Sequence, residues 1–242
     1  RTHITDVQKT ADSFLLRAKD GHAFAADRLI LTTGGQAYRH TGSTGDGYAF
    51  AQALGHRLTP LAPSLNAFFT RERWPADLAG LALPWAALTA NIPAKPSFSG
   101  PFLFTHKGVT GPAVFALSSL VAFEPYDAAR PLNVAIDALP ERPLESFRSE
   151  LGQAFHDDGR KLLGNVLATF VPKALAEIAC REASVDPRKQ AADATKEDVR
   201  RVVAWLKAMP LHVVARGAGD EFVTAGGIDT AEVNPSSMES KL

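Results

Sequence analysis

Glycine, threonine and serine gather in one stretch of the chain, residues 28–55, which reads RLILTTGGQAYRHTGSTGDGYAFAQALG. Its apolar start, Leu29–Thr33, predicts a buried strand, and Tyr48–Leu54 predicts a helix that Gly55 ends. Two glycine-rich turns join the strand to the helix. Strand ends, glycine turns and helix starts present unpartnered backbone N–H groups, so the stretch predicts a surface for phosphate oxygens or an electron-rich ring.

Three glycine-rich turns supply the candidate ligand contacts. Paired glycines let the backbone approach a planar ligand closely, because no Cβ stands in the way. The plainer interpretation is an ordinary tight turn, and for Asp46 it is a helix cap. The candidates are Thr33, Gly34 and Gly35 in the first turn, Thr41, Gly42, Ser43, Thr44, Gly45, Asp46 and Gly47 in the second, and Gly226 and Gly227 in the third.

The composition limits the class of protein. With 242 residues, the chain can form one large domain or two smaller ones, and 45% hydrophobic residues is an ordinary globular value. The single cysteine, Cys180, excludes an internal disulfide framework and fits a reducing cytoplasm. No apolar run reaches membrane-spanning length and no signal-peptide pattern is seen, so we expect a cytoplasmic protein without a membrane partner.

The charge balance and the motifs exclude several function classes. Lys+Arg and Asp+Glu both number 26, so no charge excess argues for a nucleic-acid partner. The sequence contains no HExxH motif and no Cys/His cluster, so it predicts no metal site. It also lacks the GxSxG elbow of serine hydrolases and the GxxxxGK[ST] loop of NTPases, so neither of these classes is expected. We therefore expect a small-molecule substrate, with the oligomeric state left open.

Residues 1–63 form the first predicted segment. It begins as a β-meander with strands over Ile4–Lys9, Phe14–Ala18 and His22–Ala25. Asp20–Gly21 predicts a type I′ hairpin turn, which needs positive φ at both residues. Prolines in Thr59-Pro60 and Ala62-Pro63 then break regular structure and place a domain boundary there.

Residues 64–210 predict a separate α/β unit, and residues 211–242 a return to β structure. Within the α/β unit, Ser184–Ala194 is polar and is expected to be exposed. The expected strands are Leu65–Thr70, Leu81–Ile92, Phe102–Thr105 and Leu132–Ile136, and the expected helices are Ala113–Val121, Leu144–Phe155, Lys161–Phe170, Lys173–Arg181 and Thr195–Ala208.

Four stretches together resemble a known family. They span nearly the whole chain in order: LILTTGGQAYRHTGSTGDGYAFAQALGH, FLFTHKGVTGPAVFALSS, PLHVVARGAGDEFVTAGGI and VNPSSMESKL. The sequence is similar to the bacterial FAD-dependent flavoproteins related to aminoacetone oxidase, a group of NAD(P)/FAD-dependent oxidoreductases. One TGG or TGDG motif carries little information, whereas four stretches in order are specific.

The resemblance implies an α/β fold in which an α/β insert domain interrupts a partial Rossmann-like FAD-binding domain. Residues 1–63 and 211–242 would then belong to the FAD-binding domain, and residues 64–210 to the insert. It also implies that FAD contacts the twelve candidates in the three glycine-rich turns, and that NAD(P)H can serve as reductant. The insert would cover the substrate.

Two parts of the family pattern are absent from this sequence. The family's GxGxxG fingerprint, which holds the FAD pyrophosphate at a helix start, does not occur here. Nor does the glycine-rich stretch that follows MESKL in the family. Because the chain also begins without methionine, inside a strand-like pattern, we expect a central fragment of a longer protein that is inactive by itself.

His106 is the one histidine inside a family-like motif, Phe104–Gly108. It could act as a catalytic acid or base, or shape a substrate pocket, because its charge is easily tuned near neutrality. The alternative is a structural role with a hydrogen bond to the backbone. The sequence therefore predicts the middle of an FAD-dependent oxidoreductase, and the alternative function is a non-catalytic insert or interaction module of a flavoprotein.

Overall fold

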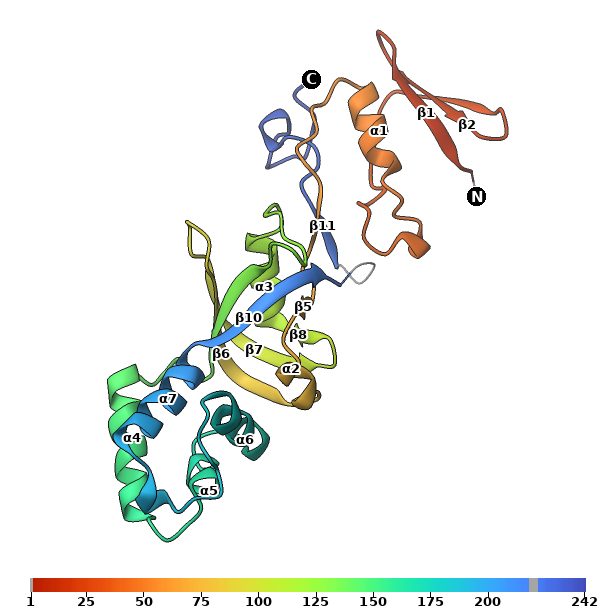
Figure 1. Ribbon diagram of the computed structural model, residues 1–242. Coiled ribbons are helices and arrows are strands. Elements are labelled where there is room, and N and C mark those ends of the chain that lie inside the picture. The colour runs from red at the N-terminus through yellow and green to blue at the C-terminus, as the bar shows by residue number, and fades with distance from the viewer. Residues whose placement is uncertain (1, 218–221) are drawn as a thin grey trace. The chain divides into compact units, whose positions relative to one another are not determined.

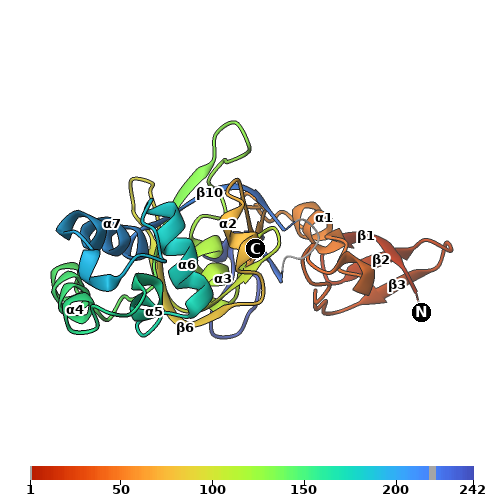
Figure 2. The same cartoon turned by 60° about the horizontal axis from the view of Figure 1, so that its bottom comes forward.

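The computed structural model describes residues 2–217 and 222–242 (Figures 1 and 2). The chain divides into two compact units. We call one the N/C unit, which consists of Arg1–Leu65 and Ala218–Leu242, and the other the barrel unit, which consists of Asn66–Gly217. No helix among the described residues is long and apolar enough to cross a membrane.

The N/C unit begins with an antiparallel three-stranded sheet in the order β1-β2-β3. Its strands are β1 (Ile4–Lys9), β2 (Phe14–Ala18) and β3 (Ala23–Ala26), which confirms the predicted meander. The predicted type I′ turn is wrong, because of its two central residues only Gly21 has a positive φ, at 89°. The Asp20 carboxylate instead accepts a hydrogen bond from the backbone N–H of His22 at 3.1 Å.

The strand predicted over Leu29–Thr33 does not form. This segment has no regular structure, and the side chain of Ile30 is 83% exposed. A strand exists only where a neighbour completes its hydrogen bonds, and no strand among the described residues pairs with this segment. Every strand pair in the described chain is antiparallel, so the Rossmann-like sheet stays a prediction.

Helix α1 (Asp46–Ala53) follows the second glycine-rich turn. Its N-cap is Gly45, so the alternative in which Asp46 caps the helix is wrong; Asp46 is instead the first helical residue. The helix ends as predicted, with Gly55 at φ 97°. The N–H of Gly55 bonds to the carbonyl of Gln52, and that of His56 to the carbonyl of Ala51. This is a Schellman motif, which satisfies carbonyls that the helix end leaves open.

A two-stranded sheet joins the two parts of the N/C unit. Strand β4 (Ala62–Ser64) pairs antiparallel with β11 (Val223–Ala225). The loop predicted over Arg216–Asp220 lies largely outside the described residues. The pairing brings segments from opposite ends of the sequence together around α1, which decides the geometry of the candidate site.

The barrel unit contains a closed antiparallel barrel in the strand order β10-β5-β8-β7-β6-β9. Alternation along β9, where Leu132, Val134 and Ile136 are buried and their neighbours are not, turns one face of the sheet inward. The strands are β5 (Phe68–Thr70), β6 (Ala82–Ala90), β7 (Ser97–Thr105), β8 (Gly108–Thr110), β9 (Leu132–Asp137) and β10 (Met209–Arg216).

The barrel sharpens one prediction and corrects another. The unit mixes helices and strands, which agrees with the predicted α/β unit; its strands form one closed antiparallel barrel, and four of its helices, α4 to α7, follow each other in the sequence. The strand expected at residues 211–216 does not begin the segment that was predicted to return to the FAD-binding domain. It is β10, a strand of the barrel, which it closes by pairing with both β5 and β9.

Helices complete the barrel unit, and all five predicted helical segments are present. Helix α3 (Pro112–Leu120) begins with Pro112, whose missing N–H is not needed in the first turn, and packs on β6 and β7 with Ala113, Val114 and Leu117 buried. The other helices are α2 (Trp74–Asp77), α4 (Leu144–Asp157), α5 (Leu163–Leu167), α6 (Lys173–Glu182) and α7 (Lys196–Lys207).

Helices α4 to α7 share a core that is continuous with the barrel. Phe147, Leu151, Leu175 and Leu206 are fully buried there. The segment 184–194 was predicted to be exposed, and this is partly wrong. Val185 and Ala191 are buried and belong to the same core. Burial also raises the pKa of the Cys180 thiol in α6 to about 12, so that it packs as a neutral apolar group.

The start of α7 is held by a buried carboxylate. Thr195 and Asp198 form a capping box, in which each side chain accepts from the other's backbone N–H. Asp198 also pairs with Lys189 at 2.5 Å and Arg201 at 2.9 Å. Burial alone would raise the pKa of Asp198, but the hydrogen bonds from Lys189 and Thr195 outweigh it and hold that pKa far below its usual range.

Asp198→Asn is expected to destabilise the barrel unit by about 2 kcal/mol at pH 7, because two cations lose their buried partner. A carboxylate with a lowered folded-state pKa contributes stability above its unfolded value near 3.8, and that stability is lost as the pH falls below it. The difference between wild type and variant should therefore shrink below pH 4. Urea unfolding at several pH values measures it, with exposed Asp193→Asn as control. Equal stability of wild type and Asp198→Asn at pH 7 would contradict the assignment.

Candidate functional site

A hollow of about 430 Å³ lies within the N/C unit. The first two glycine-rich turns, the first turn of α1 and the start of β11 surround it. The residues that line it are Gly34, Gly35, Ala37, Tyr38, Thr41, Ser43, Tyr48, Phe222, Val223 and Thr224.

Two direct contacts hold the walls of the hollow together. The backbone N–H of Gln36 donates to the hydroxyl of Thr224 at 2.8 Å, across 188 residues of sequence. The rings of Tyr38 and Phe222 meet edge to face with their centroids 5.9 Å apart. The site therefore exists only because residues 222–224, next to β4, return to the first glycine-rich turn.

Packing between the loops already requires glycine at several positions around the hollow. A Cβ on Gly35 would lie 2.8 Å from both the Thr224 and the Tyr48 hydroxyl oxygens. A Cβ on Gly47 would lie 2.1 Å from Oγ1 of Thr33. Real Cβ atoms do not approach so closely, so glycine lets these loops come together without strain. Close approach of a ligand to these glycines stays a prediction.

The lining is uncharged, since no Asp, Glu, Lys or Arg is among the described residues that form it. The hydroxyls of Ser43 and Tyr48 make no hydrogen bond to another described residue, whereas Thr41 donates to the carbonyl of Tyr38 at 2.8 Å. Two free hydroxyls beside aromatic rings can bind a planar group that has its own carbonyl and N–H groups.

The structure brings some of the predicted site residues into the lining and leaves others outside it. Gly34, Gly35, Thr41 and Ser43 line the hollow. Asp46 points to the surface, where its carboxylate lies 3.7 Å from His3. The remaining members of the same two turns lie beside the lining without being part of it: Thr33, Gly42, Thr44, Gly45 and Gly47.

The third predicted turn, Gly226-Gly227, holds the return segment against the chain before β4. Gly226 has φ 83°, and a Cβ there would lie 1.9 Å from the carbonyl oxygen of Pro60. The N–H of Gly227 donates to the Thr59 hydroxyl at 3.1 Å, and its carbonyl accepts from the N–H of Thr59 at 2.8 Å. These contacts give both glycines a structural function as a tight turn.

His106 is not part of this hollow. It lies in the barrel unit, in the exposed turn between β7 and β8. Among the residues that sequence reasoning missed are Tyr38, Tyr48, Phe222 and Thr224, all in the lining. Tyr38 and Tyr48 flank the second glycine-rich turn, which was the available signal. No neighbouring residue marks Phe222 or Thr224, because their roles depend on contacts with Tyr38 and Gln36 near the other end of the chain.

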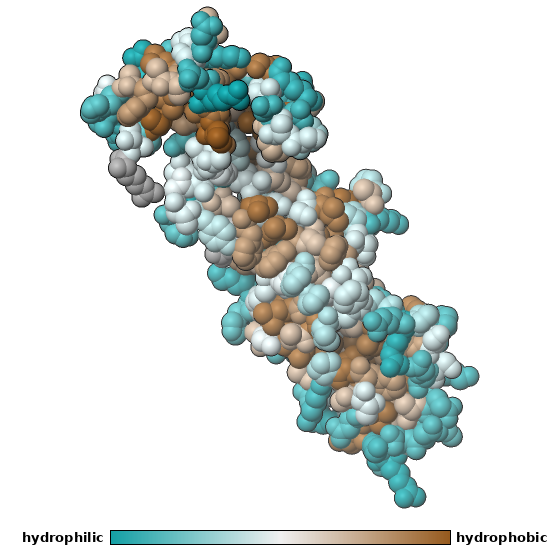
Figure 3. All heavy atoms as spheres, turned by 180° about the vertical axis from the view of Figure 1, so that it is seen from behind, coloured by the Kyte–Doolittle hydropathy of each residue, from teal (hydrophilic) through white to brown (hydrophobic). Residues whose placement is uncertain are grey.

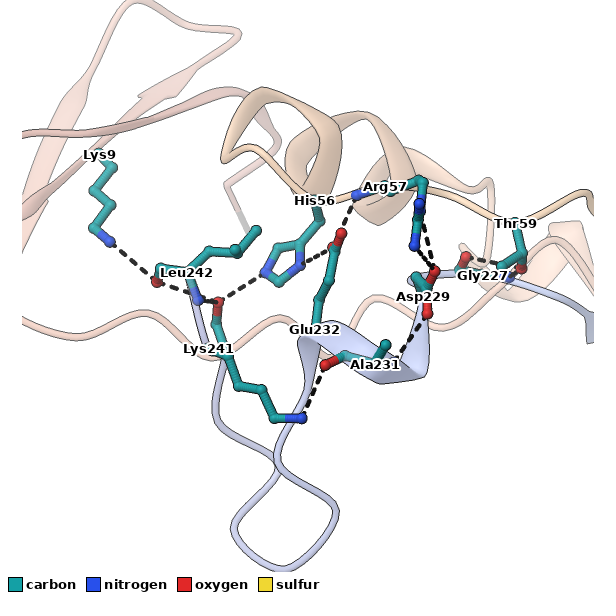
Figure 4. Close-up of polar contacts among 11 residues, drawn as sticks. Lys9, His56, Arg57, Thr59, Gly227, Asp229, Ala231, Glu232, Lys241 and Leu242 are labelled. Atoms are coloured by element: carbon teal, nitrogen blue, oxygen red, sulfur yellow. Dashed lines mark hydrogen bonds and ion pairs between the residues drawn. The ribbon is translucent and has the colours of Figure 1, made fainter.

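A polar cluster fixes the C-terminal part of the N/C unit (Figure 4). His56, just after α1, bridges two side chains of that part: its Nδ1 lies 3.0 Å from Glu232 and its Nε2 lies 2.9 Å from the Ser240 hydroxyl. Beside it, Arg57 pairs with Asp229.

Hydrogen bonds lower the pKa of both carboxylates of this cluster. The backbone N–H of Arg57, and then the ring of His56, lower the pKa of Glu232. The backbone N–H of Ala231, and then the side chain of Arg57, lower the pKa of Asp229. No group of three or more metal-ligating side chains occurs in the described part of the chain. We therefore assign the cluster to holding the return segment in place.

The model of the HI0933-like protein barrel and H2TH domain matches residues 62–221. This chain belongs to the HI0933-like family. The match covers the closed barrel and helices α2 to α7. It therefore confirms the family in its broad sense, and it does not extend to the first two glycine-rich turns.

Relatives cover the rest of the chain. This HI0933-like protein is 30% identical over 245 residues to the 3-dehydro-bile acid delta(4,6)-reductase of Clostridium scindens, which is 98% of this chain and 58% of that protein. It is 30% identical over 215 residues to the ribosomal RNA dihydrouridine synthase of Haemophilus influenzae, 88% of this chain and 50% of that protein. The synthase of the same name from Escherichia coli is 28% identical over 245 residues, 100% of this chain and 58% of that protein. The chain thus spans about half the length of the relatives it matches.

Gly226→Ala is expected to disrupt the N/C unit, because the new methyl group would overlap the Pro60 carbonyl. Gly21→Ala is the matched control. Its φ of 89° is close to that of Gly226, but no atom lies within 4 Å of the added Cβ. The control should lose only about 1 kcal/mol of unfolding free energy, the cost of an alanine in the left-handed conformation. Gly226→Ala should lower the unfolding free energy clearly more, as measured by thermal unfolding. Equal losses would show that the Pro60 contact is not tight.

Proposed function

We propose that this chain forms one wall of the flavin site of an FAD-dependent oxidoreductase. The hollow of the N/C unit carries the proposal, because its lining is uncharged, partly aromatic and supplied with free hydroxyls. The family membership and the reductase name of one relative support it. The barrel unit would cover the substrate, which is the role proposed for the insert.

The residues of the hollow fit the ring end of FAD better than its phosphates. Ser43 and Tyr48 offer hydroxyls for the carbonyl and nitrogen atoms of a flavin ring, and Tyr38 offers an aromatic edge. The start of α1 is a poor phosphate site, because Asp46 places a carboxylate in its first turn. Contacts to the pyrophosphate are therefore expected outside the residues that line the hollow.

The names of the relatives indicate one reaction class. A bile acid delta(4,6)-reductase and a dihydrouridine synthase both saturate a carbon–carbon double bond. In a 3-oxo steroid and in uracil that bond is conjugated with a carbonyl group. We propose the same class for this chain: the reduction of an α,β-unsaturated carbonyl compound. Bound FAD would carry two electrons from NAD(P)H to the acceptor, so that NAD(P)H, a proton and the alkene give NAD(P)⁺ and the alkane.

The walls of the hollow would hold and orient the ring and keep water from one of its sides. Gly34 lets the first turn approach Ser43 of the second turn, Gly35 lets it approach Tyr48 of α1, and Thr224 fixes it through Gln36. His106 stays a weak candidate for an acid or base. The finer resemblance to aminoacetone oxidase would make an amine the electron donor, and that also stays a prediction.

The test uses the full reading frame that encodes this chain, because the relatives are longer. The purified protein should be yellow, and mass analysis should find non-covalent FAD. Gly35→Ala should weaken FAD binding at least tenfold, which is about 1.4 kcal/mol, because the added Cβ collides with Tyr48 and Thr224. Gly152→Ala, on α4 with nothing within 4 Å, is the control.

Reduction of the bound flavin by NAD(P)H and its reoxidation by an enone would support the reaction class. Reduction by aminoacetone instead would favour the amine-oxidising alternative. A colourless protein that takes up no FAD on reconstitution, or equal FAD affinity of both glycine variants, would overturn the proposed site.

A further inference from the structure

A serine, a histidine and a glutamate are joined by hydrogen bonds in the polar cluster of the N/C unit. Nε2 of His56 lies 2.9 Å from the Ser240 hydroxyl, and Nδ1 lies 3.0 Å from Oε2 of Glu232, so each ring nitrogen has a contact (Figure 4). Exposed apolar side chains, which lie among hydrophilic ones on the face that Figure 3 shows, are common on folded proteins and carry no such information. A hydroxyl, an imidazole and a carboxylate joined in this order can activate a serine as a nucleophile.

The carboxylate decides which nitrogen of His56 carries the proton. Hydrogen bonds from the backbone N–H of Arg57, and then from the His56 ring, lower the pKa of Glu232. A glutamate with a lowered pKa is ionised at neutral pH and can only accept hydrogen bonds. Nδ1 of the neutral imidazole must therefore donate to Glu232. This leaves the lone pair on Nε2, which accepts from Ser240 and is placed to take its proton.

The other contacts of Ser240 hold its hydroxyl in place. Its Oγ accepts from the backbone N–H of Leu242 at 3.0 Å, and the Leu242 carbonyl lies 3.3 Å away. Two acceptors thus compete for the hydroxyl proton, and Nε2 of His56, at 2.9 Å, is the closer one. The geometry therefore favours the proton on the side of the imidazole.

The base is covered and the nucleophile is accessible. The side chains of His56 and Glu232 are only 8% and 20% exposed, whereas Ser240 is an exposed residue. The backbone N–H of Ser240 makes no hydrogen bond to another residue in the described part of the chain. It can therefore donate to the oxygen that becomes negative when the serine attacks an acyl group.

No sequence motif marks this site. Ser240 lies in Met238–Leu242, which contains no GxSxG elbow. The three residues come in the chain order His56, Glu232, Ser240, and the same geometry occurs on unrelated folds in several different orders. Geometry, rather than a motif, is therefore the evidence for it.

We propose that Ser240 is the nucleophile of an acyl-transfer site that hydrolyses a small carboxylic ester, with His56 as its general base and Glu232 positioning the histidine. Oγ bonds to the acyl carbon while its proton passes to Nε2, and the leaving alcohol takes that proton. Water, deprotonated by the same histidine, then releases the carboxylic acid and restores the serine. One ester and one water give one acid and one alcohol, with no oxidant or reductant. This activity goes beyond the flavin site and does not depend on it.

A fluorophosphonate, which reacts with activated serines, tests the nucleophile in the protein from the full reading frame. Peptide mass analysis should find Ser240 labelled at least about tenfold faster than Ser237. Ser237 is the matched control, because it is also exposed and its hydroxyl donates to Glu239 at 3.0 Å rather than to a histidine. Unfolding the protein in urea should remove the difference between the two serines.

Two variants test the neighbouring groups. Glu232→Gln should slow labelling of Ser240 at least about tenfold and leave Ser237 unchanged, because an amide no longer fixes the proton on Nδ1. Ser240→Ala should abolish hydrolysis of an aryl acetate, which Ser237→Ala should retain.

Equal labelling of Ser237 and Ser240 in the folded wild type would overturn the proposal, and so would labelling of Ser240 that Glu232→Gln leaves unchanged. The comparison of the two serines needs no variant, so it decides the matter even where a variant fails to fold. FAD takes no part in labelling, so this result is independent of the test of the flavin site.

Discussion

The candidate site depends on one long-range association, the return of residues 222–227 to the first glycine-rich turn. Strand β11 pairs with β4, Thr224 accepts from Gln36, and Gly226 fits under the Pro60 carbonyl. The loop that this association closes contains the whole barrel unit. Because the entropy of loop closure grows only slowly with loop length, and the inserted unit has its own core, a folded domain can be accommodated between the two halves.

Packing and function make different demands on the same glycines. Gly35, Gly47 and Gly226 are excluded from carrying a Cβ by neighbouring protein atoms, so their presence is explained without any ligand. What points to a ligand is the surface that remains once the loops have packed. It contains free hydroxyls, no charge, and the edge-to-face aromatic pair of Tyr38 and Phe222. The paired-glycine pattern thus led to the hollow, packing explains its glycines, and their contact with a ligand stays a prediction.

Local signals predicted the local structure well. The meander, helix α3 with Pro112 in its first turn, and the capping box of α7 follow from residues close together in sequence. The prediction failed where a partner decides the outcome. Leu29–Thr33 is apolar enough for a strand but has no strand to pair with, and closure of the barrel depends on the register of β10 against both β5 and β9. Phe222 and Thr224 were missed for the same reason.

The central claim is that the walls of the hollow, from both parts of the N/C unit, meet the flavin ring. Hydrogen exchange of the holoprotein and of the protein stripped of FAD tests it most directly. FAD should slow exchange in two separate peptides, one over residues 34–48 and one over residues 222–227, because the same ligand contacts both walls. Protection confined to peptides of the barrel unit, or to only one of the two walls, would contradict it.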